Sequence, residues 1–236
     1  MPPPGHEPFL RAICENPEED TVRLVYADWL DENADADGSA PDRARAEFIR
    51  LQILRAQLKA VGEDTKELKT RDIKLRAMHE DRWRRELPFA VRPETWQRFW
   101  RGFVSGTTTT ARYYLRHANT LFAAAPVQFV HIKELTDGLA PAFAASEYLR
   151  RVHGLTLSFS SLGDGWRSLF SGGNLVNLRW LEVRSFSLTE FTAQAIARAS
   201  LPALARIHVR GTVTRYAEAV LRTRFGVNAT WEGMQG

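Results

Sequence analysis

The histidines and the single cysteine are the residues of this chain best suited to metal binding or covalent catalysis. Zinc and nucleophilic sites place such side chains at short, recognisable intervals, as in HExxH or CxxC. No such interval separates the six histidines, which are His6, His79, His117, His131, His153 and His208. Cys14 stands alone among apolar neighbours, so we interpret it as a small core residue. We therefore predict that none of these residues forms a metal or catalytic site.

Three glycine-containing segments imitate ligand-binding loops. Residues 33–38 (NADADG) open like a calcium loop, but Pro41 and Ala44 stand at two later ligand positions. Residues 163–165 (GDG) and 172–173 (GG) lack the GxGxxG and GxxxxGK spacings that cradle phosphates, and no serine lies in a nucleophile-elbow motif. The sequence predicts a protein that is not an enzyme and that needs no cofactor or metal.

A second group of residues combines tryptophan, arginine and histidine, and binding hot spots are rich in tryptophan and arginine. They alternate with apolar residues in four segments of the form Leu-x-x-Leu-x-Leu, which begin at Val127, Val152, Leu178 and Leu204, 25, 26 and 26 residues apart. Because side chains alternate along a strand, the intervening residues share one face. The predicted partner-binding face consists of Phe129, His131, Lys133, Gly154, Thr156, Ser158, Trp180, Glu182, Arg184, Arg206, His208 and Arg210. The alternative is that the helical head or the C-terminus folds over Trp180 and buries it within the chain.

Helical segments separate these four expected strands. A second series, Leu149, Leu175, Leu201 and Val227, repeats every 26 residues. One strand and one helix per repeat resembles the leucine-rich repeat, which implies an arc with a parallel sheet on its concave side. The asparagine that usually follows the strand is replaced by Ser160, Phe186 and Thr212. The leucine that comes after it is kept as Leu162 and Leu188 and is replaced by Thr214 in the last repeat. We expect about five degenerate units over residues 101–236, with an atypical first unit (strand 102–107, helix 110–125) and a last capping strand over 228–231.

The first hundred residues have helical periodicity. Apolar spacing predicts helices over 7–15, from about 20 to 30, over 44–61 and over 65–86, with a loop over 31–42. The expected buried face of the second helix is Val22, Val25, Tyr26, Trp29 and Leu30, and that of the fourth is Leu68, Leu75, Met78 and Trp83. The predicted fold class is α/β (α+β overall), with a helical head over 1–100 followed by the repeat array.

Residues 7–54 carry a specific resemblance. Residues 23–32 (RLVYADWLDE) and 45–52 (RAEFIRLQ) are similar to the bacterial repeat-companion domain, a family that precedes repeat arrays and whose resemblance implies no defined activity. Tyr26, Asp28, Trp29, Arg45 and Glu47 lie in these segments. They form either a docking surface or a helix-packing signature, in which Asp28 and Glu47 pair with Arg23, Arg45 or Arg50.

The formal charge of +4 is distributed unevenly along the chain. Residues 1–40 hold ten acids and two arginines, whereas residues 102–236 hold fourteen bases and eight acids. We therefore expect a cytoplasmic protein-interaction module, without a membrane span or an export signal, whose basic face binds an acidic protein. Nucleic-acid binding or an accessory regulatory role is the alternative, because the isoelectric point is near 9.4.

Overall fold

The computed structural model describes residues 5–34, 40–85, 87, 96–158, 160 and 162–232. The chain forms two compact units. The first contains Met1–Gly106 and Thr120–Val127, and the second contains Thr107–Asn119 and Gln128–Gly236. The boundary between the units falls within one strand and one helix.

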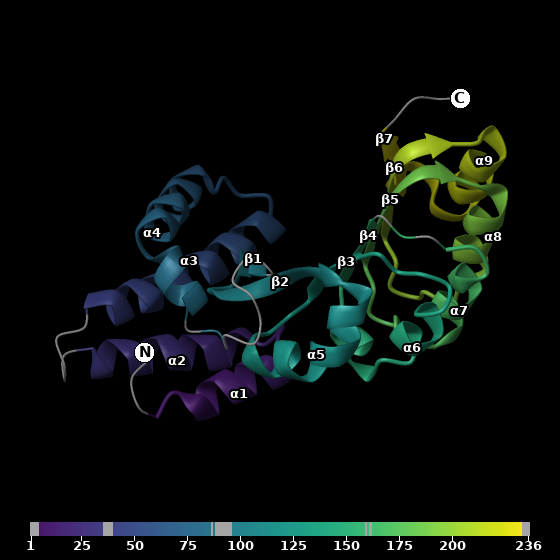
Figure 1. The fold of residues 1–236 in the computed structure, drawn as a ribbon. Helices are drawn as coiled ribbons and strands as arrows, with labels where there is room; N and C mark the ends of the chain where they lie inside the picture. Colours follow the sequence, from purple (N-terminus) through teal and green to yellow (C-terminus); the bar gives the residue numbers. More distant parts are fainter. Residues whose placement is uncertain are drawn as a thin grey trace. The chain divides into compact units, whose positions relative to one another are not determined.

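The first unit is built from helices and one hairpin (Figure 1). Its elements are α1 (Glu7–Glu15), α2 (Asp20–Asn33), α3 (Ala40–Ala60), α4 (Lys66–Arg85), β1 (Trp96–Trp100) and the first half of β2 (Phe103–Thr110). The four predicted helices are confirmed, although the third begins at Ala40 instead of residue 44. Strand β1 was not predicted. Arg101 and Gly102 join β1 to β2 with φ of 50° and 85°, the positive values that a two-residue hairpin turn requires.

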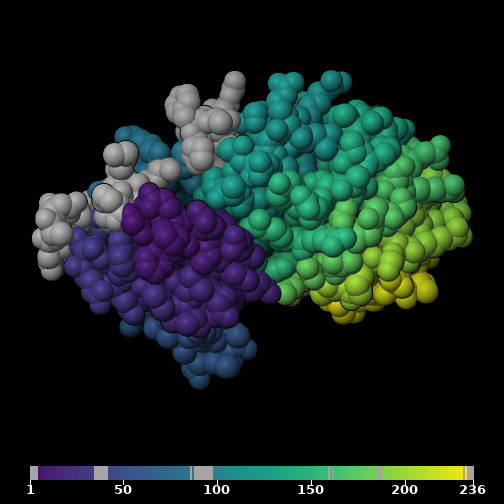
Figure 2. Space-filling model, turned by 90° about the horizontal axis from the view of Figure 1, so that it is seen from below, coloured from purple at the N-terminus to yellow at the C-terminus, as the bar shows by residue number. Residues whose placement is uncertain are grey.

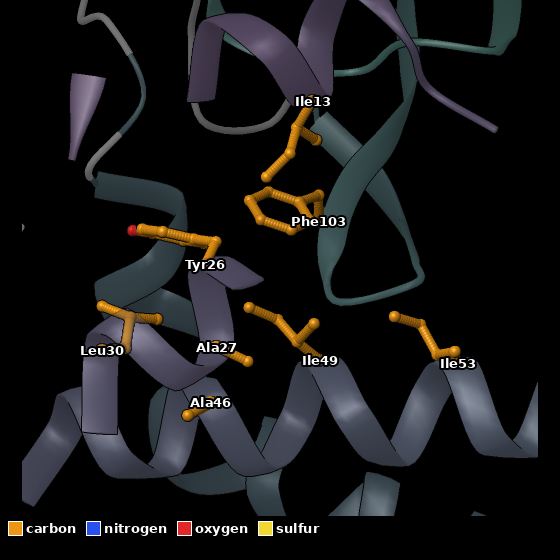
Figure 3. Close-up of a cluster of buried hydrophobic side chains, with 8 residues drawn as sticks. All are labelled: Ile13, Tyr26, Ala27, Leu30, Ala46, Ile49, Ile53 and Phe103. Atoms are coloured by element: carbon orange, nitrogen blue, oxygen red, sulfur yellow. The ribbon is translucent and has the colours of Figure 1, made fainter. Parts of the chain in front are cut away.

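The core of the first unit joins the first three helices to β2. Figure 3 shows Phe103 of β2 among side chains of all three helices; the cluster is Ile13, Tyr26, Ala27, Leu30, Ala46, Ile49, Ile53 and Phe103. A second aromatic group packs beside α4, where the ring centroids of Phe48 and Trp83 lie 4.6 Å apart. Burial of these large rings supplies the main stabilisation of a unit with so much charged surface.

Two residues predicted to be buried in this unit are exposed. Val25 is 50% exposed and Met78 is 62% exposed. The buried face of α2 is turned by a fraction of a helical turn, so that Arg23 takes the inner position at 1% exposure. Its guanidinium lies 5.5 Å from the centroid of Phe103 and its Nη1 donates to the carbonyl of Glu19 at 3.0 Å. Stacking and this hydrogen bond offset only part of the cost of burying the charge, since burial lowers the pKa of Arg23 to about 10.

The second unit alternates strands with helices, and Figures 1 and 2 show its segments following one another in chain order. Its elements begin with the end of β2, most of α5 (Ala111–Ala124), β3 (Phe129–Lys133), α6 (Ala140–Ala144) and the 3-10 turn Glu147–Arg151. They continue with β4 (Gly154–Ser158), α7 (Gly165–Ser171), β5 (Trp180–Leu188), α8 (Glu190–Arg198), β6 (Arg206–Val213), α9 (Arg215–Phe225), the 3-10 turn Gly226–Asn228 and β7 (Ala229–Glu232).

The strands lie in one sheet in sequence order, and those from β3 to β7 are paired in parallel. This confirms the predicted α/β class. The predicted inward residues of the four repeat strands are at most 2% exposed: Val130, Ile132, Leu155, Leu157, Leu181, Val183, Ile207 and Val209. Helices α6 to α9 lie on the side of the sheet that these residues face (Figure 1). We name the opposite side, toward which the intervening residues point, the open face.

A hydrogen-bond pattern recurs where each strand begins. The carbonyl of Gln128 accepts from the backbone N–H groups of His153 and Gly154 at 2.8 and 3.1 Å. The carbonyls of His153 and Arg179 accept in the same way from the next unit, from N–H groups 26 and 27 residues later. These paired bonds fix the register between strands, so that equivalent side chains stand next to each other across the sheet.

One predicted equivalence between repeats is wrong by one residue. Leu188 pairs in register with Val213 and not with Thr214, because the pairing of β5 and β6 shifts between Arg184 and Ser187. Val213 is 8% exposed and fills the apolar position. Thr214 instead caps α9, since its side chain accepts a hydrogen bond from the N–H of Ala217 at 3.2 Å.

Candidate functional site

All twelve residues predicted for the partner-binding face lie on the open face of β3 to β6. Strand register arranges them in three rows across the sheet. The aromatic row is Phe129, Gly154, Trp180 and Arg206; the middle row is His131, Thr156, Glu182 and His208; the basic row is Lys133, Ser158, Arg184 and Arg210. Strand β7 extends the last two rows by Thr230 and Glu232. The sequence therefore identified the face, and the parallel register determines which residues are neighbours.

Gly154 allows the aromatic row to close over β4. A Cβ at this position would stand 2.6 Å from Cδ1 of Phe129 and 3.0 Å from Cε3 of Trp180. The two rings therefore converge above a glycine that has no side chain to separate them. Both aromatic residues are half-buried. Each ring thus keeps some accessible surface while its orientation is restricted by the other.

The middle row is largely buried, which corrects the expectation that the whole face is accessible. Thr156 and Glu182 are 5% and 2% exposed, and Ser158 of the basic row is 2% exposed. The hydroxyl of Thr156 donates to Oε2 of Glu182 at 3.3 Å. These buried side chains support the face and offer little surface to a partner.

Glu182 is the anionic centre of the face. Nε of Arg184 donates to its Oε1 at 2.9 Å, and Nε of Arg210 approaches the same oxygen at 2.8 Å. Burial raises the pKa of Glu182, but the hydrogen bond from Arg184 and the charges of Arg184 and Arg210 outweigh burial and hold the pKa below its usual range. The buried carboxylate stays ionised and orients two guanidinium groups, whose side chains remain 40% and 49% exposed.

The two histidines of the middle row are each held by hydroxyl groups. Nε2 of His131 lies 2.6 Å from the hydroxyl of Ser158, and its Nδ1 lies 3.4 Å from that of Thr108. Nδ1 of His208 lies 2.7 Å from the hydroxyl of Thr230. Burial lowers the pKa of His131, and the charges of Arg184 and Lys133 lower it further against the opposing charge of Glu182. His131 is therefore neutral at pH 7.

The accessible charge of the open face is basic. Arg184, Arg206 and Arg210 are exposed and Lys133 is half-buried. Arg210 also approaches Glu232 at 3.6 Å. Within the described part of the chain, no carboxylate pairs with Arg206 or Lys133. The face thus combines an aromatic row with exposed arginines that a buried carboxylate positions.

Polar residues of the head that lie in the segments 23–32 and 45–52 contact neighbouring helices. Arg50 of α3 donates to Asp28 and to Asp31 of α2, each at 2.6 Å. This matches the predicted pairing of Asp28. The prediction for Glu47 is wrong, since its carboxylate accepts from Arg71 of α4 at 2.5 and 2.7 Å.

Arg45 takes part in stacking: its guanidinium lies 4.9 Å from the Trp83 ring and 5.0 Å from the Phe103 ring. It therefore links the two aromatic groups of the first unit.

In the described residues, no group of three or more histidine, cysteine, aspartate or glutamate side chains is placed to hold a metal ion. Of the calcium-like segment 33–38, residues 35–38 lie outside the described residues. No helix in the described part is long and apolar enough to cross a bilayer. No family model matches the chain, and neither the curated proteins nor the solved structures contain a match.

Proposed function

We propose that this chain is a non-catalytic cytoplasmic interaction module that binds an acidic segment of another protein on its open face. The observation that supports this best is the parallel register, which sets an aromatic row and a basic row across four strands on either side of the middle row. Tryptophan and arginine contribute most to the affinity of protein interfaces when they are held in place. Here the Phe129 ring restricts Trp180 above Gly154, and Glu182 restricts Arg184 and Arg210.

The spacing of the rows limits the shape of the partner. Trp180 and Arg184 are four residues apart on β5, which corresponds to about 13 Å at 3.3 Å per residue. Neighbouring strands are about 4.8 Å apart, so the four strands span roughly 14 Å in the other direction. We infer a partner segment that runs along the strands, with one large apolar side chain at the aromatic row and carboxylates at the basic row.

Positioned arginines favour such a partner energetically. A guanidinium whose orientation is already fixed loses little conformational entropy when it binds a carboxylate. The buried Glu182 neutralises part of the positive charge, which leaves Lys133 and Arg206 as cations without a carboxylate partner in the described residues. The result is a moderately basic face with directional hydrogen bonds, which suits specific recognition of carboxylates.

The test is site-specific photo-crosslinking in the native cell, followed by binding measurements with the captured partner. A crosslinking amino acid at position 180 is expected to capture a defined protein, and the same amino acid at exposed position 216 on α9 is not. The double variant Trp180→Ala, Arg206→Glu is expected to weaken binding of that purified protein at least about a hundredfold, the loss of one or two hot spots.

The matched control makes the same chemical changes on the helical side. Tyr216 is 52% exposed and Arg215 precedes it on α9. The variant Tyr216→Ala, Arg215→Glu is expected to bind as the unaltered protein does. Equal binding by all three proteins would contradict the proposal. Tight binding to random DNA or RNA, with a steep loss between low and physiological salt, would instead support the nucleic-acid alternative.

A further inference from the structure

The first unit contains a pocket that the proposed function does not use. It lies between α3, α4 and β1 and has a volume of about 300 Å³. Four cations line it, from Arg55 and Lys59 of α3, Arg76 of α4 and Arg98 of β1. Asp72 is the carboxylate of the lining, and Trp100 forms an aromatic part of the wall.

The floor of the pocket is a fixed polar network. Asp72 is 5% exposed and accepts from Nε2 of Gln52 at 3.1 Å and from Nη1 of Arg55 at 2.6 Å. The Gln52 side chain is itself held, since its Oε1 accepts from the N–H of Gly102 at 2.8 Å. Arg55 therefore stands in a defined orientation at the wall. An arginine has five N–H donors, and the bond to Asp72 uses one of them.

Arg76 is positioned in a similar way. Its Nε donates to Glu80 at 2.8 Å, and its guanidinium lies 5.7 Å from the centroid of Phe99. Lys59, by contrast, is exposed and has no ion pair with the described part of the chain. Even when Glu80 is counted with Asp72, the cations outnumber the carboxylates by two. The pocket thus attracts an anion, and its guanidinium groups are oriented before the anion arrives.

We propose that this pocket binds a small organic phosphate. A phosphate monoester carries up to two negative charges and three terminal oxygens, which suits a pocket lined by several guanidinium and ammonium groups. The volume lies at the lower end of the range for small-molecule sites. The organic part of the ligand contacts Trp100, the more accessible of the two aromatic side chains that line the pocket. This inference is independent of the open face, because all its residues belong to the first unit.

The test is a titration of the full chain with AMP, inorganic phosphate and adenosine, in which binding is measured by calorimetry or NMR. AMP is expected to bind with a dissociation constant of roughly 0.01–1 mM and inorganic phosphate several-fold more weakly, while adenosine does not bind. Lys59→Glu is expected to weaken the binding of both anions at least about tenfold. Trp100→Leu should weaken AMP several-fold and leave inorganic phosphate unchanged.

A matched control is Lys74→Glu, an exposed substitution on α4 outside the pocket lining, which should leave all affinities unchanged. Chemical shifts of the unaltered core verify that each variant folds. Three results would overturn the proposal: no binding of either anion up to about 5 mM, binding that Lys59→Glu leaves intact, or equal affinity for AMP and inorganic phosphate. The last result would identify an inorganic anion site.

Discussion

Nε of Arg210 on β6 lies 2.8 Å from Oε1 of Glu182 on β5, and the Glu182 side chain is only 3% exposed. A second arginine, Arg184, donates to the same oxygen. A carboxylate in this position has two effects. Its buried negative charge is compensated by the two guanidinium groups. It also fixes these two cations at the surface where we propose that a partner binds.

Replacing Glu182 should cost stability in a pH-dependent way. Glu182→Gln loses the charge that two arginines surround, and we expect the free energy of unfolding at pH 7 to fall by about 1–3 kcal/mol. Since the pKa of Glu182 is lowered in the folded protein, its contribution is present above the unfolded pKa of about 4.3 and is lost as the pH falls through the folded pKa. Urea unfolding at pH 7 and pH 3 measures both effects.

The same substitution at Glu147, which is exposed, is the control and should change stability by less than about 0.5 kcal/mol. An equal loss at pH 7 and pH 3 for Glu182→Gln would show that packing, and not charge, accounts for the effect.

His131 should lower the free energy of unfolding in mild acid. Its pKa is lowered in the folded state by burial first and by Arg184 and Lys133 next, so the unfolded chain binds the proton more readily. Stability is therefore complete above the unfolded pKa of about 6.5 and falls as the pH drops from there toward the folded pKa. His131→Gln should remove that part of the pH dependence between pH 7 and pH 5. An NMR titration of the His131 ring should show a higher pKa in Lys133→Met, and no change in that variant would contradict this assignment.

The hairpin turn depends on Gly102 for two reasons that can be separated. Its φ is 85°, and an added Cβ would stand 2.4 Å from Cγ1 and 2.8 Å from Cα of Ile49. Gly102→Ala should therefore destabilise the protein by roughly 2–4 kcal/mol. Gly62 has a similar φ of 82° with nothing within 4 Å, so Gly62→Ala should cost only about 1 kcal/mol. Thermal unfolding compares the two, and equal losses would rule out the contact with Ile49 as the cause.

The spacing of the aromatic row can be tested at Gly154. Gly154→Ala introduces a methyl group 2.6 Å from Phe129, which must move either this ring or that of Trp180. We expect a loss of stability of about 1–2 kcal/mol and a larger relative loss of partner binding. Tryptophan fluorescence and binding of the crosslinked partner are the measurements. Unchanged affinity in a folded variant would show that the aromatic row does not contact the partner.

The sequence alone determined the alternation of the second unit. Apolar residues at a period of about 26 have few other ways to be buried than by stacking equivalent strands, so β3 to β6 and the open face follow from spacing. The helices of the head follow in the same way from their 3.6-residue periodicity. Their rotation does not, because α2 offers two overlapping faces. One contains Val25 and the other contains Arg23, and hydropathy favours the wrong one.

Only the tertiary structure decided which side chains are neighbours. Arg23 is buried because Phe103, which is distant in sequence, provides a ring for its guanidinium. Glu182 is buried because parallel register brings Thr156 and Arg210 from adjacent strands to its carboxylate. The cationic pocket of the first unit likewise depends on β1, which the sequence did not predict. Periodicity reports which side of an element faces the core, whereas contacts between distant elements depend on register, turn geometry and packing, none of which a local pattern encodes.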